Sequence, residues 1–253
     1  MIRLAKSSDK ADLLCAAGLY RPAGAAIATA WALYSTSPGQ ALFWLSDDGG
    51  AAISLVDGEM NISAGNVCDT DELCDFARAV GFKTLSAPPE ICGRLSDMGR
   101  VESGAVMEYR GGIAREFTTT EADPQDVYSL ICNVTGQKLQ SPAWSPWYVH
   151  LSLLKRRGIG RFVGIYENEK LISTAGIYAQ DKTHALIAGA ATAHNHRGRG
   201  LAGELVAALA AEATASGKIP FLLCDDKLCG WYEGLGFTAM GRWNKIYVGE
   251  KIL

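Results

Sequence analysis

The sequence lacks the features that mark several large classes of protein. Its seven cysteines are scattered and include no C-x-x-C pair, which argues against a zinc site or a disulfide framework. It has no excess of positive charge, and a net charge of −3 disfavours a general nucleic-acid binder. Its apolar stretch Pro22–Tyr34 is too short to span a bilayer and lies too far along the chain for a signal peptide. We therefore expect a cytoplasmic protein with reduced thiols, without a metal ion, and with neither a nucleic-acid nor a membrane partner.

The composition that is present is that of a folded globular protein. Hydrophobic residues make up 48% of the 253 residues and charged residues 20%, enough for one large domain or two small ones. A strand-like run ends at Tyr109–Gly112, and a helix is expected after it, with Thr120 or Asp123 as N-cap and Pro124 in the first turn. This pattern predicts two domains, 1–112 and 113–253.

The two predicted domains share a faint internal repeat. Residues 76–111 can be laid beside residues 212–249, and both stretches follow the order helix, glycine, strand, short helix, glycine, strand, strand. Gly81 then matches Gly217, and Gly99 matches Gly236. We expect the two halves to have the same shape.

A basic, glycine-rich turn lies between a predicted strand that ends near Thr192 and a predicted helix over 200–216. The turn reads Arg-Gly-Arg-Gly-Leu-Ala from Arg197 to Ala202. The N-terminus of a helix has free N–H groups, glycine lets a ligand approach the backbone closely, and arginine bonds phosphate, so the turn suits a pyrophosphate. It matches neither G-x-x-x-x-G-K-[ST] nor G-x-G-x-x-G, which disfavours a nucleotide hydrolase or a Rossmann dehydrogenase.

Two motifs in the second half resemble those of the GNAT N-acetyltransferases. Arg-x-x-Gly-x-Ala after a strand is similar to that family's acetyl-CoA loop, and "WYEGLGF" (Trp231–Phe237) resembles its "[FY]YEKLGF" segment. The resemblance covers residues 116–250, and the first half only through the repeat. It implies an α/β (α+β) fold with a mixed, mostly antiparallel sheet flanked by helices, in two tandem GNAT-like halves.

The resemblance also implies how the residues bind acetyl-CoA, the expected co-substrate. Its pyrophosphate would lie on the backbone of Arg197, Gly198, Arg199, Gly200, Leu201 and Ala202. Its pantetheine arm would run beside the preceding strand, where an N–H among Ala190, Ala191 and Thr192 would polarise the thioester carbonyl. Tyr232 would protonate the leaving thiolate after direct attack by an amine in a ternary complex.

The acceptor and the general base are less well defined by the sequence. The resemblance implies an acceptor site between the early helices and the strands, where Trp144, Trp147 and Tyr148 would form an apolar or cation-binding wall, and the expected acceptor is a small-molecule amine. Many relatives have a glutamate on the strand before the loop, but this strand has no carboxylate. His184 begins that strand, and Asp181, Glu167 and His150 are remoter candidates for a base. A water chain, or an amine of low pKa, would need no dedicated base.

The first half departs from the family pattern at the equivalent loop, residues 62–76. It has no arginine there, and Asp69, Asp71 and Glu72 would repel a pyrophosphate. We expect a degenerate GNAT-like domain without an acetyl-CoA loop. Two alternatives to an acetyltransferase stay open, namely a non-catalytic acyl-CoA-binding regulatory protein and an aminoacyl transferase of tandem GNAT-like type. The expected oligomeric state is a monomer or a homodimer.

Overall fold

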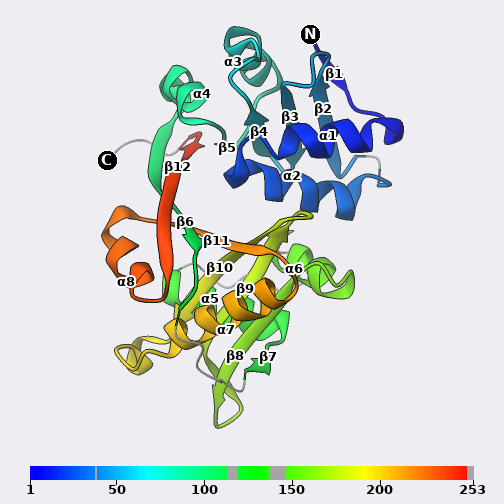
Figure 1. Ribbon diagram of the computed structural model, residues 1–253. Coiled ribbons are helices and arrows are strands. Elements are labelled where there is room, and N and C mark those ends of the chain that lie inside the picture. The colour runs from blue at the N-terminus through cyan, green and yellow to red at the C-terminus, as the bar shows by residue number, and fades with distance from the viewer. Residues whose placement is uncertain (38, 113–118, 137–145, 250–253) are drawn as a thin grey trace. The chain divides into compact units, whose positions relative to one another are not determined.

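The computed structural model describes residues 1–37, 39–112, 119–136 and 146–249 of the chain. These residues form two compact units (Figure 1). Unit 1 comprises residues 1–106, 223–227 and 240–253, and unit 2 comprises residues 107–222 and 228–239. The predicted boundary at residue 113 lies outside the described residues, so the division into domains 1–112 and 113–253 stays a prediction.

The order of the elements is the same in the two halves of the chain. Each half runs strand, two helices, three strands, helix, strand, helix, strand. The first half contains β1 (Ile2–Leu4), α1 (Lys10–Ala17), α2 (Arg21–Tyr34), β2 (Ala41–Ser46), β3 (Ala51–Val56), β4 (Glu59–Ala64), α3 (Thr70–Val80), β5 (Thr84–Ser86), α4 (Pro89–Arg94) and β6 (Arg100–Tyr109). The second contains β7 (Thr120–Glu121), α5 (Pro124–Thr135), α6 (Pro146–Arg156), β8 (Arg161–Glu167), β9 (Lys170–Gln180), β10 (His184–Thr192), α7 (Leu201–Ala215), β11 (Ile219–Cys224), α8 (Cys229–Glu233) and β12 (Phe237–Tyr247).

The pairing of the strands follows the same rule in each unit. In unit 1, β1 to β4 are antiparallel neighbours, β4 pairs with β5 in parallel, and β5 pairs with the end of β12. In unit 2, β7 to β10 are antiparallel neighbours and β10 pairs with β11 in parallel. The helices α3 and α7 make the crossovers that these parallel pairs require. The prediction of a mixed, mostly antiparallel sheet flanked by helices, in two similar halves, is confirmed.

Short local signals set the ends of the helices. Asp123, one of the two predicted caps of α5, accepts a hydrogen bond from the amide of Gln125, and Pro124 follows it. Gly81 and Gly217, which the repeat matches to one another, follow α3 and α7 with φ of 76° and 75°. Only glycine adopts such angles without strain, so the repeat preserves the ends of both crossover helices.

A buried core in unit 1 joins α3 and α4 to the strands β3, β4 and β5 through Ile53, Ile62, Leu73, Leu85 and Ile91.

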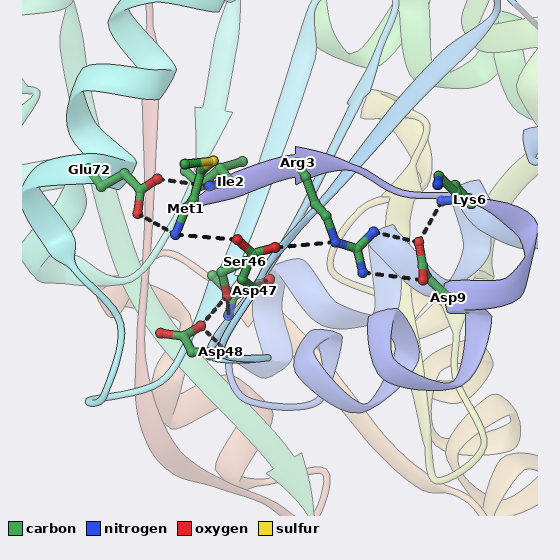
Figure 2. Close-up of polar contacts among 11 residues, drawn as sticks. Met1, Ile2, Arg3, Lys6, Asp9, Ser46, Asp47, Asp48 and Glu72 are labelled. Carbon is green, nitrogen blue, oxygen red and sulfur yellow. Dashed lines mark hydrogen bonds and ion pairs between the residues drawn. The ribbon is translucent and has the colours of Figure 1, made fainter.

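Near the start of this unit, the guanidinium of Arg3 donates two hydrogen bonds to the carboxylate of Asp9, 2.7 and 3.2 Å long (Figure 2). The amide of Lys6 donates a third, of 2.7 Å.

In unit 2, α5 and α7 both pack on β9 and β10 (Figure 1). The inward face of α7 is formed by Leu205, Val206 and Leu209, which are all buried. This packing fixes the start of α7 beside the end of β10. In the described part of the chain, none of the seven cysteines forms a disulfide. Within the described ranges, no helix has the length and apolar character needed to cross a membrane.

Candidate functional site

The strand β10 leaves part of its backbone out of the sheet. It pairs with β11 at its first three residues, His184–Leu186, and its register with β9 shifts between Ala188 and Ala191. Gly189 lies in this bulge with φ of 64°, a conformation that favours glycine. Among the described strands, β10 therefore offers the backbone around Gly189 and Ala190 to a ligand that runs alongside it. This is the stretch where the sequence predicts the pantetheine arm.

The loop after β10 presents an open helix N-terminus. Gly198 and Gly200 have φ of 77° and 79°, and a Cβ on either would have no neighbour within 4 Å. Gly200 is the N-cap of α7, and no side chain caps the helix there. The first N–H groups of α7 are thus available to an anion, which the partial positive charge of the helix end favours.

The equivalent helix of unit 1 has no such opening. The side chain of Asp69, the N-cap of α3, accepts hydrogen bonds of 3.0 and 3.1 Å from the amides of Asp71 and Glu72. The amides that would bind a pyrophosphate are therefore occupied by a carboxylate of the chain itself.

Charged side chains surround the loop of unit 2. Arg197 donates from Nε to the carbonyl oxygen of Thr192 over 3.3 Å, which ties the loop to the end of β10. The side chain of Arg199 is 54% exposed and lies 4.0 Å from Glu167. A hydrogen bond of 2.8 Å from His196, together with the charge of Arg199, lowers the pKa of Glu167 from its ordinary value. The exposed guanidinium of Arg199 therefore lies next to an ionised carboxylate, with which an anion at the loop would compete.

Tyr232 lies on α8, which packs against the first turn of α7. A Cβ on Gly203 would lie 3.3 Å from Leu235 and 3.5 Å from Trp231, so this glycine permits the close approach of α8. The ring of Tyr232 is 8% exposed and makes edge contacts with Trp231 and Phe237, at centroid distances of 4.6 and 5.9 Å. The first turn of α7 and the helix that carries Tyr232 are therefore in contact within unit 2.

The residues predicted for the acceptor site fall into an aromatic cluster. Trp147 and Tyr148 of α6 both contact Tyr128 of α5, at centroid distances of 5.5 and 6.1 Å. Trp147 also stacks on Tyr178 of β9, at 6.4 Å and 24°. Trp144 lies outside the described residues. Sequence reasoning missed Tyr128 and Tyr178, because neither belongs to a motif.

A separate pocket of about 750 Å³ opens between α5, the start of β9 and residues 193–196. Its lining combines the apolar side chains of Leu130, Leu171 and Ile172 with the polar ones of Asp126, Ser129, Asn133, Lys170, His194 and His196. Neither Trp147 nor Tyr148 is part of this lining. The pocket therefore lies beside the loop rather than at the predicted aromatic wall.

Two of the candidate bases form a pair at the start of β10. Nδ1 of His184 lies 3.3 Å from Asp181, whose pKa is raised by burial but lowered overall by hydrogen bonds from the amides of Thr183 and His184. Gly189 lies five positions after His184 in the strand, a distance of roughly 16 Å at the usual rise per residue. The pair of His184 and Asp181 therefore lies far from the bulge. Glu167, another candidate base, lies beside the loop, where it is hydrogen-bonded to His196.

Comparisons with known proteins bear on the family and the fold of the chain. The model of the acetyltransferase (GNAT) family matches residues 125–237. One similar structure is a tandem GNAT protein from the clavulanic acid biosynthesis pathway, solved without AcCoA. The match covers 100% of this chain and 99% of that one, with 11% identity and a TM-score of 0.60. For a GCN5-related N-acetyltransferase from Sphaerobacter thermophilus, the match covers 100% of this chain and 96% of the other, with 14% identity and a TM-score of 0.60. For one from Kribbella flavida, it covers 91% of this chain and 95% of the other, with 16% identity and a TM-score of 0.59. None of the curated proteins is a significant match to the sequence.

Proposed function

We propose that the protein transfers an acetyl group from acetyl-CoA to an amine of a small molecule, because residues 125–237 match the model of the acetyltransferase (GNAT) family. The main support for this proposal is the N-terminus of α7, which follows Gly198 and Gly200 and is not capped by a described side chain. It supplies free N–H groups and a partial positive charge for the pyrophosphate, and Arg199 adds a mobile cation.

The reaction follows from the order of groups along β10 and the loop. With the pyrophosphate on residues 197–202, the pantetheine arm runs beside the unpaired backbone of β10 toward Gly189. The neutral amine attacks the thioester carbon, so a C–N bond forms and the C–S bond breaks. The nitrogen loses one proton to water, from which Tyr232 is reprotonated after it has donated its own. A backbone N–H among Ala190–Thr192 stabilises the oxyanion, and Tyr232 donates a proton to the departing thiolate.

The amine must be neutral when it attacks, and β10 carries no carboxylate to deprotonate it. We propose an acceptor whose amine has a low pKa or loses its proton through water. The aromatic cluster of Trp147 and Tyr148 supplies an apolar wall for such an acceptor and no acidic group for a polycation.

The proposal includes a division of roles between the units and a location. Unit 2 binds acetyl-CoA, while unit 1 is a degenerate copy whose α3 amides are held by Asp69. The protein acts in the cytoplasm, where its free thiols stay reduced.

A thiol-release assay with acetyl-CoA and a panel of primary amines tests the activity. Tyr232→Phe is expected to lower kcat by about 10²-fold, the usual contribution of a positioned proton donor. Tyr109→Phe is the matched control, because the ring of Tyr109 also contacts Phe237, at 5.2 Å, and should leave kcat unchanged. Binding of acetyl-CoA without thiol release by any amine would contradict the proposal and favour a non-catalytic acyl-CoA-binding protein.

A further inference from the structure

One polar atom next to the candidate site has no protein partner. The hydroxyl oxygen of Tyr178 is buried and, within the part of the chain that the structure describes, accepts and donates no hydrogen bond. Buried hydroxyls nearly always have a partner, because an unpaired one destabilises the fold. Such an atom beside a ligand site indicates that the ligand supplies the missing partner.

The position of this hydroxyl is defined by Gly189. A Cβ on Gly189 would lie 2.2 Å from the hydroxyl oxygen of Tyr178, so any larger residue would displace the phenol. Two features therefore require glycine at position 189. Its φ of 64° disfavours other residues, and the phenol of Tyr178 fills the space that a Cβ would occupy. The hydroxyl lies at the centre of the β10 bulge, where the backbone is free of the sheet.

Neighbouring rings hold the phenol in place. Trp147 stacks on one side of Tyr178, and Phe162 makes an edge contact with it at 5.2 Å and 72°. A side chain fixed in this way loses little further freedom when it bonds a ligand, which is the preorganisation that an oxyanion site needs.

We propose that the hydroxyl of Tyr178 donates a hydrogen bond to the thioester carbonyl oxygen of bound acetyl-CoA and stabilises the oxyanion that forms there. This inference rests on the proposed function. When the amine nitrogen bonds to the carbonyl carbon, the carbonyl electron pair moves to oxygen; when the pair returns, the C–S bond breaks and the thiolate leaves. Tyr178 keeps its own proton throughout.

The titration of Tyr178 agrees with a donor role. Burial raises its pKa above the ordinary value, so the phenol stays protonated across the neutral range. A protonated phenol in a water-poor site donates a strong hydrogen bond to a developing oxyanion but does not act as a base.

Infrared spectroscopy tests the contact without knowledge of the acceptor. The probe is acetyl-CoA labelled at its thioester carbonyl and bound to the wild type and to Tyr178→Phe. A hydrogen bond lowers the carbonyl stretching frequency, so the wild type should show a lower frequency than the variant. Equal frequencies in the two complexes would overturn the inference and leave the proposed function standing. Failure of the wild type to bind acetyl-CoA would overturn both.

Stability and kinetics separate this role from a structural one. Tyr178→Phe removes an unpaired hydroxyl, so its thermal midpoint should equal or exceed that of the wild type, whereas kcat should fall about 10²-fold with KM for acetyl-CoA little changed. Tyr166→Phe is the control, because its hydroxyl is bonded to Asp126 over 2.9 Å. That variant should lose stability and keep its carbonyl frequency. A Tyr178→Phe variant with unchanged kcat would contradict the proposal.

Discussion

The carboxylate of Glu167, at the end of β8, lies 4.0 Å from the guanidinium of Arg199 in the loop before α7. Its other oxygen is 2.8 Å from Nε2 of His196. Glu167 thus holds a negative charge next to the arginine that is proposed to contact the pyrophosphate. Because its pKa is lowered by the hydrogen bond from His196, the carboxylate stays ionised at neutral pH and competes with the ligand for Arg199.

Neutralising Glu167 should therefore tighten the binding of acetyl-CoA. An exposed ion pair contributes about 0.2–1 kcal/mol, so Glu167→Gln is expected to lower Kd up to about 5-fold at low ionic strength. The gain should shrink as salt screens the charges. Calorimetric titrations at low and high salt measure it. A weaker Kd for Glu167→Gln at low salt would mean that the carboxylate supports the loop rather than competing with the ligand.

Gly200 and Gly217 offer a matched pair at the two ends of α7. Both have positive φ, of 79° and 75°, and neither has a neighbour within 4 Å of its Cβ position. Alanine at either site should cost about 1 kcal/mol of unfolding free energy, because of the left-handed backbone alone. Gly200→Ala should also weaken acetyl-CoA binding at least tenfold, since its Cβ enters the space expected for the pyrophosphate, whereas Gly217→Ala should not. Unfolding by urea and calorimetric titration give the two readouts, and an equal loss of binding in both variants would contradict this account.

The cap at Asp69 predicts one acetyl-CoA site per chain. The amides at the start of α3 are bonded to this carboxylate, while those of α7 are open. Asp69→Ala should cost about 1 kcal/mol of stability, as the loss of a helix N-cap usually does. It should leave the stoichiometry at one, because Asp71 and Glu72 still repel a pyrophosphate. Calorimetry measures the stoichiometry, and a second site in the wild type would show that unit 1 is not degenerate.

The ion pair of Arg3 and Asp9 predicts part of the response to acid (Figure 2). The hydrogen bonds from Arg3 and from the amide of Lys6 lower the pKa of Asp9 from 3.8 to about 2. Because the pKa is lower in the folded state, this stabilisation is fully present above pH 3.8 and is lost as the pH falls through about 2. Asp9→Asn should be less stable than the wild type at pH 6, and the difference should close as the pH falls from about 4 to 2. Urea unfolding across this range checks it; a difference that persists at pH 2 would argue against the ion pair as its cause.

Sequence patterns predicted those parts of the site that depend on neighbouring residues. The turn Arg197–Ala202, the helix after it and the cap at Asp123 follow from local backbone chemistry, and the structure has the expected helices there. The repeat also predicted the shared order of elements, because matched glycines end both crossover helices.

Long-range features of the site escaped prediction. Tyr178 and Gly189 meet where the register between β9 and β10 shifts twice, between Leu186 and Ile187 and between Ala188 and Ala191, and a slip of register moves side chains to the opposite face. A glycine inside a predicted strand is a signal for a bulge, and it would have directed attention to Gly189. The stacking of Tyr178 on Trp147 depends on how α6 packs on the sheet, which periodicity does not specify.

A calorimetric titration of the purified protein with acetyl-CoA, beside Arg199→Glu, tests the central claim that the open end of α7 binds the pyrophosphate of coenzyme A. The account predicts binding to the wild type with a Kd of about 10⁻⁶ M, or about 8 kcal/mol, and a large loss of affinity in Arg199→Glu. Absence of binding to the wild type, or equal affinity in the variant, would contradict it and leave the glycine turn as a helix start without a ligand.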